Sequence, residues 1–394
     1  MDKKPFYWAA GIEDTFISAP HRTTGRTLDE YELTDHYRNW KCDLTHLASL
    51  GIDLARWGIP WYKVNPAPHE FVWEWIDQVM DFVSNQVHLD ILLDLLHYGT
   101  PAWIEGSFFN PDFPSYFLDY AETVFERYAG TIRWVTPVNE PSVNALYCGE
   151  RGEWPPYGSH DRDFLSVLKN LCKAISSVTK LAGEMNIKTV QVEADLLYVA
   201  GSSAVQEQTD FLSRKGLLSW EILSGRIHEG HPLFPWLRKN GWSDHDTEYF
   251  AEASFPDILG LNYYPQWSVT KILGNSTTEP VYGGTEYLTQ SIHRWKKEYG
   301  KPVMVTETSF RGTPAERSAW LVESTDAVLA MEDCIGYTWF PAIDMIDWDY
   351  RNSTDPIERF RMPLGLWDHE RKENEAAETY RRIIKRNRSG KENR

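Results

Sequence analysis

Two glutamates each stand at the end of an apolar run of the sequence, where they are suited to act as a pair. Glu140 lies in the segment TPVNEP (residues 136–141), directly after Asn139, and Glu307 lies in VMVTET (residues 303–308). Both runs are typical of buried strands, and parallel strands that close into a barrel bring their carboxyl ends to one mouth. Two carboxyl groups at such a mouth, one ionised and one protonated, are what cleavage of a glycosidic bond by double displacement requires. This chemistry is the first hypothesis for the pair.

The elements that must position these acids alternate along the whole chain. Apolar runs rich in Val, Ile, Leu and aromatic residues are each followed by an amphipathic segment, which is the pattern of a parallel sheet covered by helices. We count eight such units and predict the α/β fold of a (β/α)8 TIM barrel. The strands are expected to begin near Phe6, Ile52, Leu89, Ile132, Thr189, Asp257, Pro302 and Ile335. The helices are expected over residues 40–50, 72–83, 116–128, 164–181, 205–223, 285–299, 315–331 and 375–386.

A single barrel domain is expected over residues 1–394. Barrels of this type commonly use about 250 residues or more, with insertions, and no low-complexity linker interrupts the 394 residues of this chain. An open doubly wound sheet also fits the alternation, but it usually has fewer strands and often an early glycine-rich phosphate loop, which this sequence lacks. The basic end, residues 381–394, is expected to be the final helix followed by a solvated, frayed tail.

A barrel also predicts which other side chains join the two glutamates. Residues that close several apolar runs should converge at the C-terminal ends of the strands, despite their wide separation in sequence. The converging set is Arg56, His97, Asn139, Glu140, Asn262, Tyr264, Glu307 and Trp339. Glu193, an acid inside the fifth predicted strand, is a further candidate to face the same cleft.

Charge and composition exclude several classes of partner. A formal net charge of −17 argues against binding to nucleic acid or to an anionic membrane surface, because phosphates would be repelled over most of the protein. The first residues, MDKKPFYW, reach no apolar stretch long enough for a signal peptide, and no later stretch is long enough to span a bilayer. We therefore expect a cytoplasmic protein with a neutral or locally compensated substrate and with no membrane partner. The oligomeric state is left open.

Neither a metal nor a cofactor is expected. His228, His231 and His245 lie in a loop-rich region without an assured metal-binding cluster, and the sequence has no nucleotide fingerprint and no serine nucleophile elbow. Four cysteines, Cys42, Cys148, Cys172 and Cys334, are isolated in sequence and are expected to be reduced thiols, mostly buried.

Aromatic residues are abundant and many fall in predicted loops. They make up 14% of the chain, and Trp103, Trp154, Trp242, Trp267 and Trp348 lie outside regular helical spacing. Flat apolar faces suit the C–H faces of pyranose rings, although packing of a large core is the ordinary role of any single Trp. Only the concentration of these residues beside the acidic motifs favours sugar stacking.

These motifs resemble those of glycoside hydrolase family 1, the β-glucosidase and β-galactosidase group, over nearly the whole chain. NEP at residues 139–141 resembles the acid/base motif of the family, and GLNYY at 260–264 resembles its motif on strand six. Glu307 matches the position of the nucleophile. The segments NPDF at 110–113 and YAETVFERY at 120–128 are similar to the stretch that the family places before strand four. The shared order of the motifs is more specific than any one of them.

The resemblance implies a retaining exo-acting β-glycosidase. It makes Glu307 the nucleophile and Glu140 the acid/base, with Arg56 and Tyr264 stabilising the charge of Glu307. Asn139 is implied to bond the sugar 2-OH. His97 is implied to bind the sugar, and Trp339 to form a platform beneath it.

The sequence departs from the family where the sugar is recognised. The stretch GIED at residues 11–14 stands where the family has a Gln, so Glu13 is expected to act in its place. Asp347 and Trp348 stand, in a shifted context, where the family has Glu and Trp after strand eight. The identity of the sugar is therefore open. Two other functions also stay open: a sugar-binding protein without hydrolysis, and a transglycosidase or endo-glycanase of the same clan.

Overall fold

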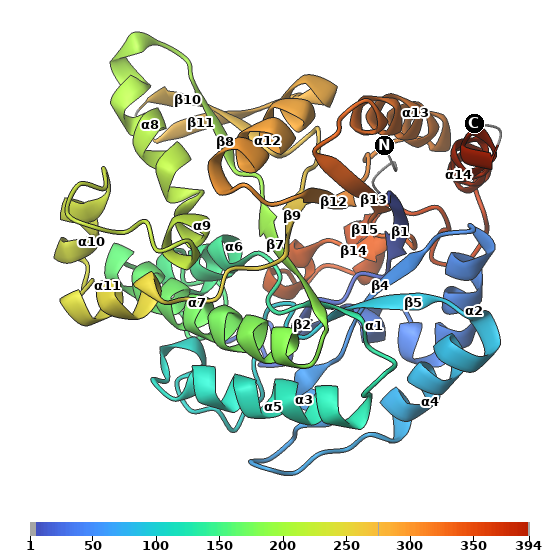
Figure 1. The fold of residues 1–394 in the computed structure, drawn as a ribbon, viewed down its shortest axis with the longest axis horizontal. Coiled ribbons are helices and arrows are strands. Elements are labelled where there is room, and N and C mark those ends of the chain that lie inside the picture. The colour runs from blue at the N-terminus through green and yellow to red at the C-terminus, as the bar shows by residue number, and fades with distance from the viewer. Residues whose placement is uncertain (1–4, 275, 393–394) are drawn as a thin grey trace.

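The computed structural model describes residues 5–274 and 276–392, and its centre is a closed barrel of eight parallel strands (Figure 1). The order around the barrel is β1, β13, β12, β9, β7, β6, β5 and β4, and β1 pairs with both β13 and β4. The strands are β1 (Tyr7–Gly11), β4 (Leu54–Gly58), β5 (Asp90–Asp94), β6 (Trp134–Thr136), β7 (Lys188–Ala194), β9 (Ile258–Asn262), β12 (Val303–Thr308) and β13 (Cys334–Trp339). The predicted fold is confirmed, and each strand starts within two residues of its expected position.

Helices follow the strands and cover the outside of the barrel (Figure 1). The longer ones are α2 (His36–Ser49), α4 (Glu74–Phe82), α5 (Phe113–Arg127), α7 (Asp161–Glu184), α12 (Gly284–Tyr299), α13 (Pro314–Leu329) and α14 (Glu375–Glu392). The shorter ones are α1 (Glu30–Leu33), α3 (Trp61–Val64), α6 (Pro141–Ala145), α8 (Gln206–Lys215), α9 (Leu218–Leu223), α10 (Phe234–Lys239) and α11 (Asp244–Ala251).

Amphipathic spacing explains why these helices lie against the strands. On α7, the fully buried side chains Leu168, Leu171, Ile175 and Val178 recur every three or four residues and form one apolar stripe. The start of α13 is fixed by a capping box, in which Thr313 and Glu316 satisfy each other's backbone N–H groups. Tertiary burial and local capping therefore agree on the same helices.

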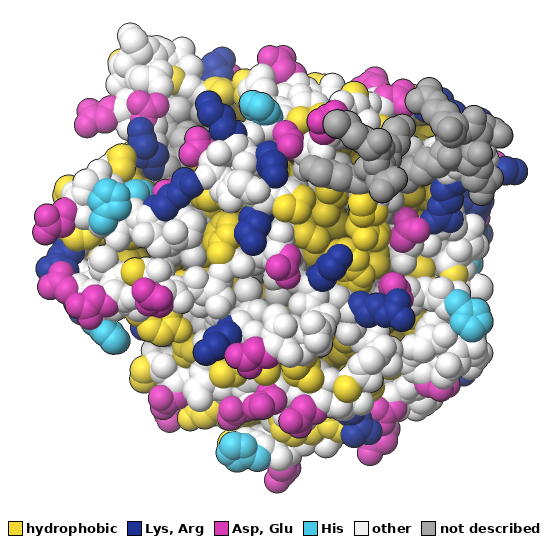
Figure 2. All heavy atoms as spheres, viewed as in Figure 1, with side chains coloured by type: hydrophobic (Ala, Val, Ile, Leu, Met, Phe, Trp, Pro, Cys, Tyr) yellow, Lys and Arg dark blue, Asp and Glu magenta, His cyan; other side chains and the backbone are white. Residues whose placement is uncertain are grey.

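The amino-terminal end of the barrel is closed by apolar side chains. A layer of Ala9, Leu54, Leu92, Trp134, Val190, Ile258, Met304 and Ile335 fills the barrel there. Hydrophobic side chains also gather near the centre of the face drawn in Figure 2. A packed apolar plug leaves the polar chemistry to the opposite end.

Three parts of the fold differ from the expectation. The helix expected over residues 205–223 is two helices, α8 and α9, and the chain turns between them at Gly216, where a Cβ would lie 3.2 Å from Leu196. Helix α14 continues to Glu392, so most of the expected tail is helical, while residues 393–394 lie outside the described part. A small sheet of β8 (Leu197–Ala200), β10 (Val269–Gly274) and β11 (Thr277–Val281) was not expected, and with α8 it projects from the barrel (Figure 1).

The remaining strands are short pairs beside the barrel. They are β2 (Phe16–Ile17) with β3 (Leu28–Asp29), and β14 (Met345–Ile346) with β15 (Arg361–Met362). All four cysteines are free thiols, and only Cys42 is exposed. Within residues 5–274 and 276–392, no helix combines the length and the apolar character needed to cross a membrane.

Candidate active site

A cavity of about 530 Å³ opens at the C-terminal ends of the barrel strands, and both glutamates line it. Polar and aromatic groups from several strand ends and from the loops after them form the rest of its wall. They include Glu13, His97, Tyr98, Tyr147, Trp154, Tyr198, Asn262, Tyr264, Trp267, Asp347 and Trp348. Residues far apart in the sequence thus share one polar pocket, as the barrel topology predicts.

Glu307 comes from β12 at an irregular point of the barrel. Opposite β9, the register shifts between Val305 and Glu307, so that Glu307 pairs with Asn262 and Thr306 is the extra residue of a bulge. Arg56 donates a hydrogen bond to one carboxylate oxygen of Glu307. The hydroxyl of Tyr264 donates to the other oxygen at 2.7 Å. Both oxygens of the Glu307 carboxyl group therefore accept hydrogen bonds, one from a guanidinium and one from a phenol.

Arg56 is completely buried and connects Glu307 to a second acid and to the motif around Glu140. Its Nη2 atom lies 2.7 Å from the carboxylate of Asp94 and 2.7 Å from Oδ1 of Asn139. Asp94 ends the adjacent strand β5 and Glu307 lies near the end of β12, and these two carboxylates explain how a guanidinium is retained without solvent. The contact between Arg56 and Glu307 therefore supports the predicted role of Arg56.

Glu140 occupies a strained turn between β6 and α6. Its backbone is in the left-handed region, at φ 42° and ψ 64°, which is uncommon for a residue other than glycine. Asn262 Nδ2 donates to Oε1 of Glu140 at 2.8 Å, and the hydroxyl of Tyr98 donates to Oε2. Burial, together with the nearby negative charge of Glu307, raises the pKa of Glu140 to about 7, although the hydrogen bonds from Tyr98 and Asn262 act in the opposite direction. Glu140 can therefore carry a proton near neutral pH.

Asn139 and His97 form the floor between the two acids. Asn139 Nδ2 lies 2.9 Å from Nε2 of His97 and donates to the hydroxyl of Tyr98 at 3.2 Å. On the far side of the ring, His97 Nδ1 lies 2.7 Å from the carboxylate of Asp14. Burial lowers the pKa of His97, but the charge of Asp14 and further carboxylates outweigh this effect and raise it well above its usual value. Asp14 thus fixes the orientation of the His97 ring.

Gly58 makes room for that orientation. A Cβ at Gly58 would lie 2.0 Å from a carboxylate oxygen of Asp14, so any larger residue would displace Asp14 from His97. Phe340 lies parallel to the His97 ring, with the ring centroids 6.2 Å apart. The imidazole is therefore fixed both at its edge and at its face.

Glu13 supplies a further carboxyl group to the cavity wall. Its Oε1 accepts from the Thr15 hydroxyl at 2.6 Å and lies 3.8 Å from His97 Nε2. Burial raises the pKa of Glu13 to about 7, against the lowering effect of the His97 charge, and the Glu307 charge adds to the rise. The side chain can thus donate or accept hydrogen bonds near neutral pH.

Aromatic side chains form one wall of the cavity. The ring centroids of Tyr147 and Trp154 lie 4.4 Å apart, those of Trp154 and Trp348 lie 5.1 Å apart, and those of Tyr98 and Trp348 lie 5.3 Å apart. Trp267 also lines the cavity and is 40% exposed, and its ring contacts Tyr264 with the ring centroids 5.4 Å apart. Two of the loop tryptophans singled out in the sequence belong to the core instead. Trp242 is buried in the core, and Trp103 is partly buried and packs against the core.

The structure brings together almost all of the residues predicted for the site. Glu13, His97, Glu140, Asn262, Tyr264, Glu307, Asp347 and Trp348 line the cavity. Arg56 and Asn139 lie directly beneath it and bond to the lining residues. Trp339 is fully buried, does not line the cavity, and donates its indole N–H to the carbonyl of Leu364. Its role as a sugar platform stays a prediction.

Four residues of the site were missed by the sequence analysis. Asp94 ends β5 and pairs with Arg56. Its place at the end of an apolar run was the one weak indication in the sequence that Asp94 belongs to the site. Tyr98 follows His97 directly, but nothing in the sequence indicates its bond to Glu140. Asp14 and Phe340 act on His97 through tertiary contacts alone. Glu193 was proposed to face the cleft, but it is fully buried and is not part of the cavity wall.

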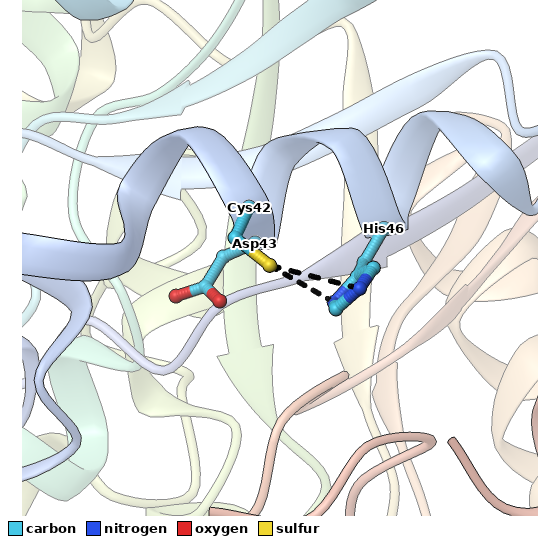
Figure 3. A group of neighbouring side chains, drawn as sticks. All are labelled: Cys42, Asp43 and His46. Atoms are coloured by element: carbon cyan, nitrogen blue, oxygen red, sulfur yellow. Dashed lines mark hydrogen bonds between the residues drawn. The ribbon is translucent and has the colours of Figure 1, made fainter. Parts of the chain in front are cut away.

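Two groups of side chains have metal-ligating atoms close together. Cys42, Asp43 and His46 project from α2 on the outside of the barrel (Figure 3). There Asp43 is already engaged, because its carboxylate bonds Arg371 at 3.0 Å and His36 at 2.8 Å. The second group, Asp14, Asp94 and His97, is the ion-pair network beneath the cavity, which Arg56 completes. In both groups, a carboxylate is thus already paired with an arginine of the protein, Arg371 in the first group and Arg56 in the second.

Comparisons with known proteins agree with this geometry. Residues 9–225 match the family described as Glycosyl hydrolase family 1. Beta-glucosidase A of Acetivibrio thermocellus is 28% identical over 410 residues, which cover 90% of this chain and 87% of that protein. Aryl-phospho-beta-D-glucosidase BglC of Bacillus subtilis is 24% identical over 281 residues, covering 66% of this chain and 56% of that protein. Beta-glucosidase 25 of Oryza sativa is 25% identical, covering 67% of this chain and 50% of that protein.

The last two alignments thus span about half the length of the relatives concerned. Among solved structures, the family 1 β-glucosidase from Thermotoga maritima superposes with a TM-score of 0.80. That superposition covers 97% of this chain and 99% of the other at 18% identity, and at this identity it concerns the fold.

Proposed function

The chain belongs to glycosyl hydrolase family 1, and from this premise we propose that it is a retaining, exo-acting β-glycosidase. The bond cleaved is the one between a terminal β-linked sugar and its aglycone. β-Glucosidase activity is the starting assumption, because relatives such as Beta-glucosidase A of Acetivibrio thermocellus carry that name. Fold and family leave the choice of sugar to the residues that line the cavity.

One observation carries the proposal: two glutamates share one cavity but have opposite electrostatic surroundings. Glu307 accepts hydrogen bonds from the Arg56 guanidinium and the Tyr264 hydroxyl. Glu140 has no cation on its carboxyl group among its hydrogen-bond partners, and burial raises its pKa to about 7. A pair with one ionised and one protonated member is what a retaining glycosidase needs at neutral pH.

The first half of the reaction forms a covalent glycosyl-enzyme. A carboxylate oxygen of Glu307 attacks C1 of the sugar while the bond from C1 to the leaving oxygen breaks, and Glu140 gives its proton to that oxygen. The electron pair of the broken bond stays with the leaving group, which departs as an alcohol. Formation of the ester neutralises Glu307, and the charge that raised the pKa of Glu140 is then lost.

The second half returns the enzyme to its starting state. Glu140, now ionised, takes a proton from a water molecule as the water oxygen attacks C1 and the ester bond to Glu307 breaks. Two inversions at C1 give net retention. Asn139 lies between both acids and is proposed to bond the 2-OH, a contact that strengthens as positive charge develops on the ring.

The remaining lining residues are proposed to bind the sugar hydroxyls and ring. Glu13, His97, Asn262 and Asp347 offer polar atoms, and Trp348 offers an aromatic face. Several acids line the cavity, including Asp195, Asp347 and Asp349, whereas its lining arginines are Arg151 and Arg311. A glycone with a phosphate would meet repulsion here. We therefore propose a sugar without negative charge, unlike the substrate named for the Bacillus relative.

Hydrolysis of a panel of aryl β-glycosides tests the proposed function. We expect release of the aryl group from at least one sugar, with the β-anomer seen first by proton NMR. Oligosaccharides then test the exo action, since single terminal sugars are the expected product. Internal cuts or new linkages would instead favour an endo-glycanase or a transglycosidase. Tight sugar binding without turnover of any member of the panel would overturn the proposal.

A further inference from the structure

Strand β7 contacts the loop of Glu140 through three successive residues. Beyond β6, which ends at Thr136, the chain does not continue the regular ladder with β7. Instead, Gln191, Val192 and Glu193 contact every second residue of the loop, namely Val138, Glu140 and Ser142. The acid/base loop is therefore held from one side by a single segment of strand.

Side chains supply most of these contacts. Gln191 Nε2 donates to the carbonyl of Val138 at 2.6 Å, and the Val192 carbonyl accepts from the backbone N–H of Glu140 at 3.2 Å. One oxygen of Glu193, Oε2, accepts from both the backbone N–H of Ser142 at 3.1 Å and its hydroxyl at 2.8 Å. Gln191 and Glu193 are both fully buried. These bonds pin the loop immediately before and after Glu140.

Glu140 needs such support because its own backbone conformation is unfavourable. A non-glycine residue in the left-handed region persists only where its surroundings determine it. The next residue, Pro141, has no backbone N–H and cannot donate a hydrogen bond to the turn. Ser142 is thus the first residue after Glu140 with a backbone donor, and its partner is Glu193.

We propose that Glu193 is a positioning residue for Glu140, which holds the acid/base carboxyl group in register with the leaving oxygen through Ser142. This inference rests on the proposed function and concerns a residue outside the cavity. Glu193 is itself fixed from behind, because the hydroxyl of Ser219 on α9 donates to it at 2.5 Å and the backbone N–H of Ala194 donates at 3.0 Å. A carboxyl group with four donors is a rigid support.

Glu193 can play this part without adding charge near the reacting groups. Burial raises its pKa to about 8, although the hydroxyls of Ser219 and Ser142 act in the opposite direction. At neutral pH the side chain is then mostly a neutral acid. In a glutamine the amide oxygen can keep the bonds from Ser142 and Ser219 and only the bond from Ala194 is lost, whereas an alanine removes every bond to Ser142.

Leaving-group dependence separates positioning from plain structural support. A misplaced acid slows the departure of poor leaving groups, while a 2,4-dinitrophenyl group leaves without protonation. For Glu193→Ala, we expect kcat/KM on the phenyl glycoside to fall about 100-fold, the lower end of what a general acid contributes. On the dinitrophenyl glycoside of the same sugar, we expect little change. Azide, which needs no base to attack the glycosyl-enzyme, should raise kcat of this variant on the dinitrophenyl glycoside.

The control is Thr189→Val at the other end of β7. Thr189 is also buried, and its hydroxyl bonds Asp257 at 3.1 Å, far from the loop of Glu140. This variant should lose stability without a leaving-group effect. Glu193→Gln should restore the wild-type ratio between the two substrates. Ser142→Ala removes one of the two loop bonds and should give a smaller loss of the same selective kind, which keeps the test open if Glu193→Ala does not fold.

An equal loss on both substrates in Glu193→Ala or Ser142→Ala, with an active wild type, would overturn the positioning role alone. A wild type that is inactive on both substrates and on the full panel would overturn the proposed function and this inference with it.

Discussion

Arg56 on β4 donates to the carboxylate of Glu307 on β12, although 251 positions separate the two residues in the chain. The same guanidinium bonds Asp94 and Asn139, each at 2.7 Å. One buried cation therefore links the proposed nucleophile to the motif that carries the proposed acid. The two halves of the site are set relative to each other by a residue that does not line the cavity.

Removal of the proposed nucleophile should abolish turnover. For Glu307→Ala, we expect kcat on an aryl β-glycoside to fall about 10⁴-fold or more, because no covalent intermediate can form. Azide should restore release of the aryl group and give a glycosyl azide of inverted configuration, seen by NMR. Unaltered activity in the variant, or an azide product of retained configuration, would contradict the assignment of Glu307.

Loss of Arg56 should cost stability as well as activity. Arg56→Met leaves Asp94 and Glu307 buried without their cation, and removal of one partner of a buried pair typically costs about 3–5 kcal/mol. Urea unfolding measures this difference. Arg133→Met is the control, because its ion pair with Asp90 at 3.6 Å is on the surface and should contribute less than about 1 kcal/mol. An equal decrease in the free energy of unfolding in the two variants would contradict the proposed role of Arg56.

The pH dependence of kcat/KM should report the protonation of Glu140. The pKa of Glu140 is raised to about 7 by burial and by Glu307. As an acid catalyst it acts only when protonated, so kcat/KM for a phenyl glycoside should fall as the pH rises through about 7. In Glu140→Gln, kcat/KM should be lower at all pH values and should not fall as the pH rises through about 7. A profile that stays flat from pH 6 to 9 in the wild type would contradict the assignment.

A negative charge on the glycone should weaken catalysis. We expect the 6-phosphate of the preferred aryl glycoside to have a kcat/KM at least about tenfold lower, which corresponds to about 1.4 kcal/mol of repulsion. Asp347→Asn should narrow the difference, whereas Glu323→Gln, on the exposed face of α13, should not. Faster hydrolysis of the phosphorylated substrate would show that the acids of the cavity do not set this preference.

Periodicity in the sequence was sufficient to predict the barrel and the strand ends that converge. The buried pattern of β12 and the apolar run before Glu140 locate both acids, because the C-terminal ends of parallel strands meet at one mouth. The break between α8 and α9 at Gly216 was missed, since the apolar spacing continues across it. Where a helix breaks depends on packing between distant segments, and the periodicity of the sequence contains no information on that packing.

The polar support of the site was harder to predict than the groups it supports. Asp14 acts on His97 only because Gly58 leaves room for it, and this relation joins three different segments. Likewise, Glu193 was noticed as an acid on a strand, but its partner Ser142 is fixed by the course of a loop beyond β6. The bulge at Thr306 has no local signal either.

The sheet of β8, β10 and β11 extends the cavity wall beyond the barrel. Its strands come from the loops after β7 and β9, and its residues Tyr198 and Thr270 belong to the cavity wall. Because it projects from the barrel (Figure 1), its residues can be replaced without disturbing the proton-transfer groups below. Under the proposed function, substitutions in this sheet would change which aglycone binds and leave Glu140 and Glu307 in place.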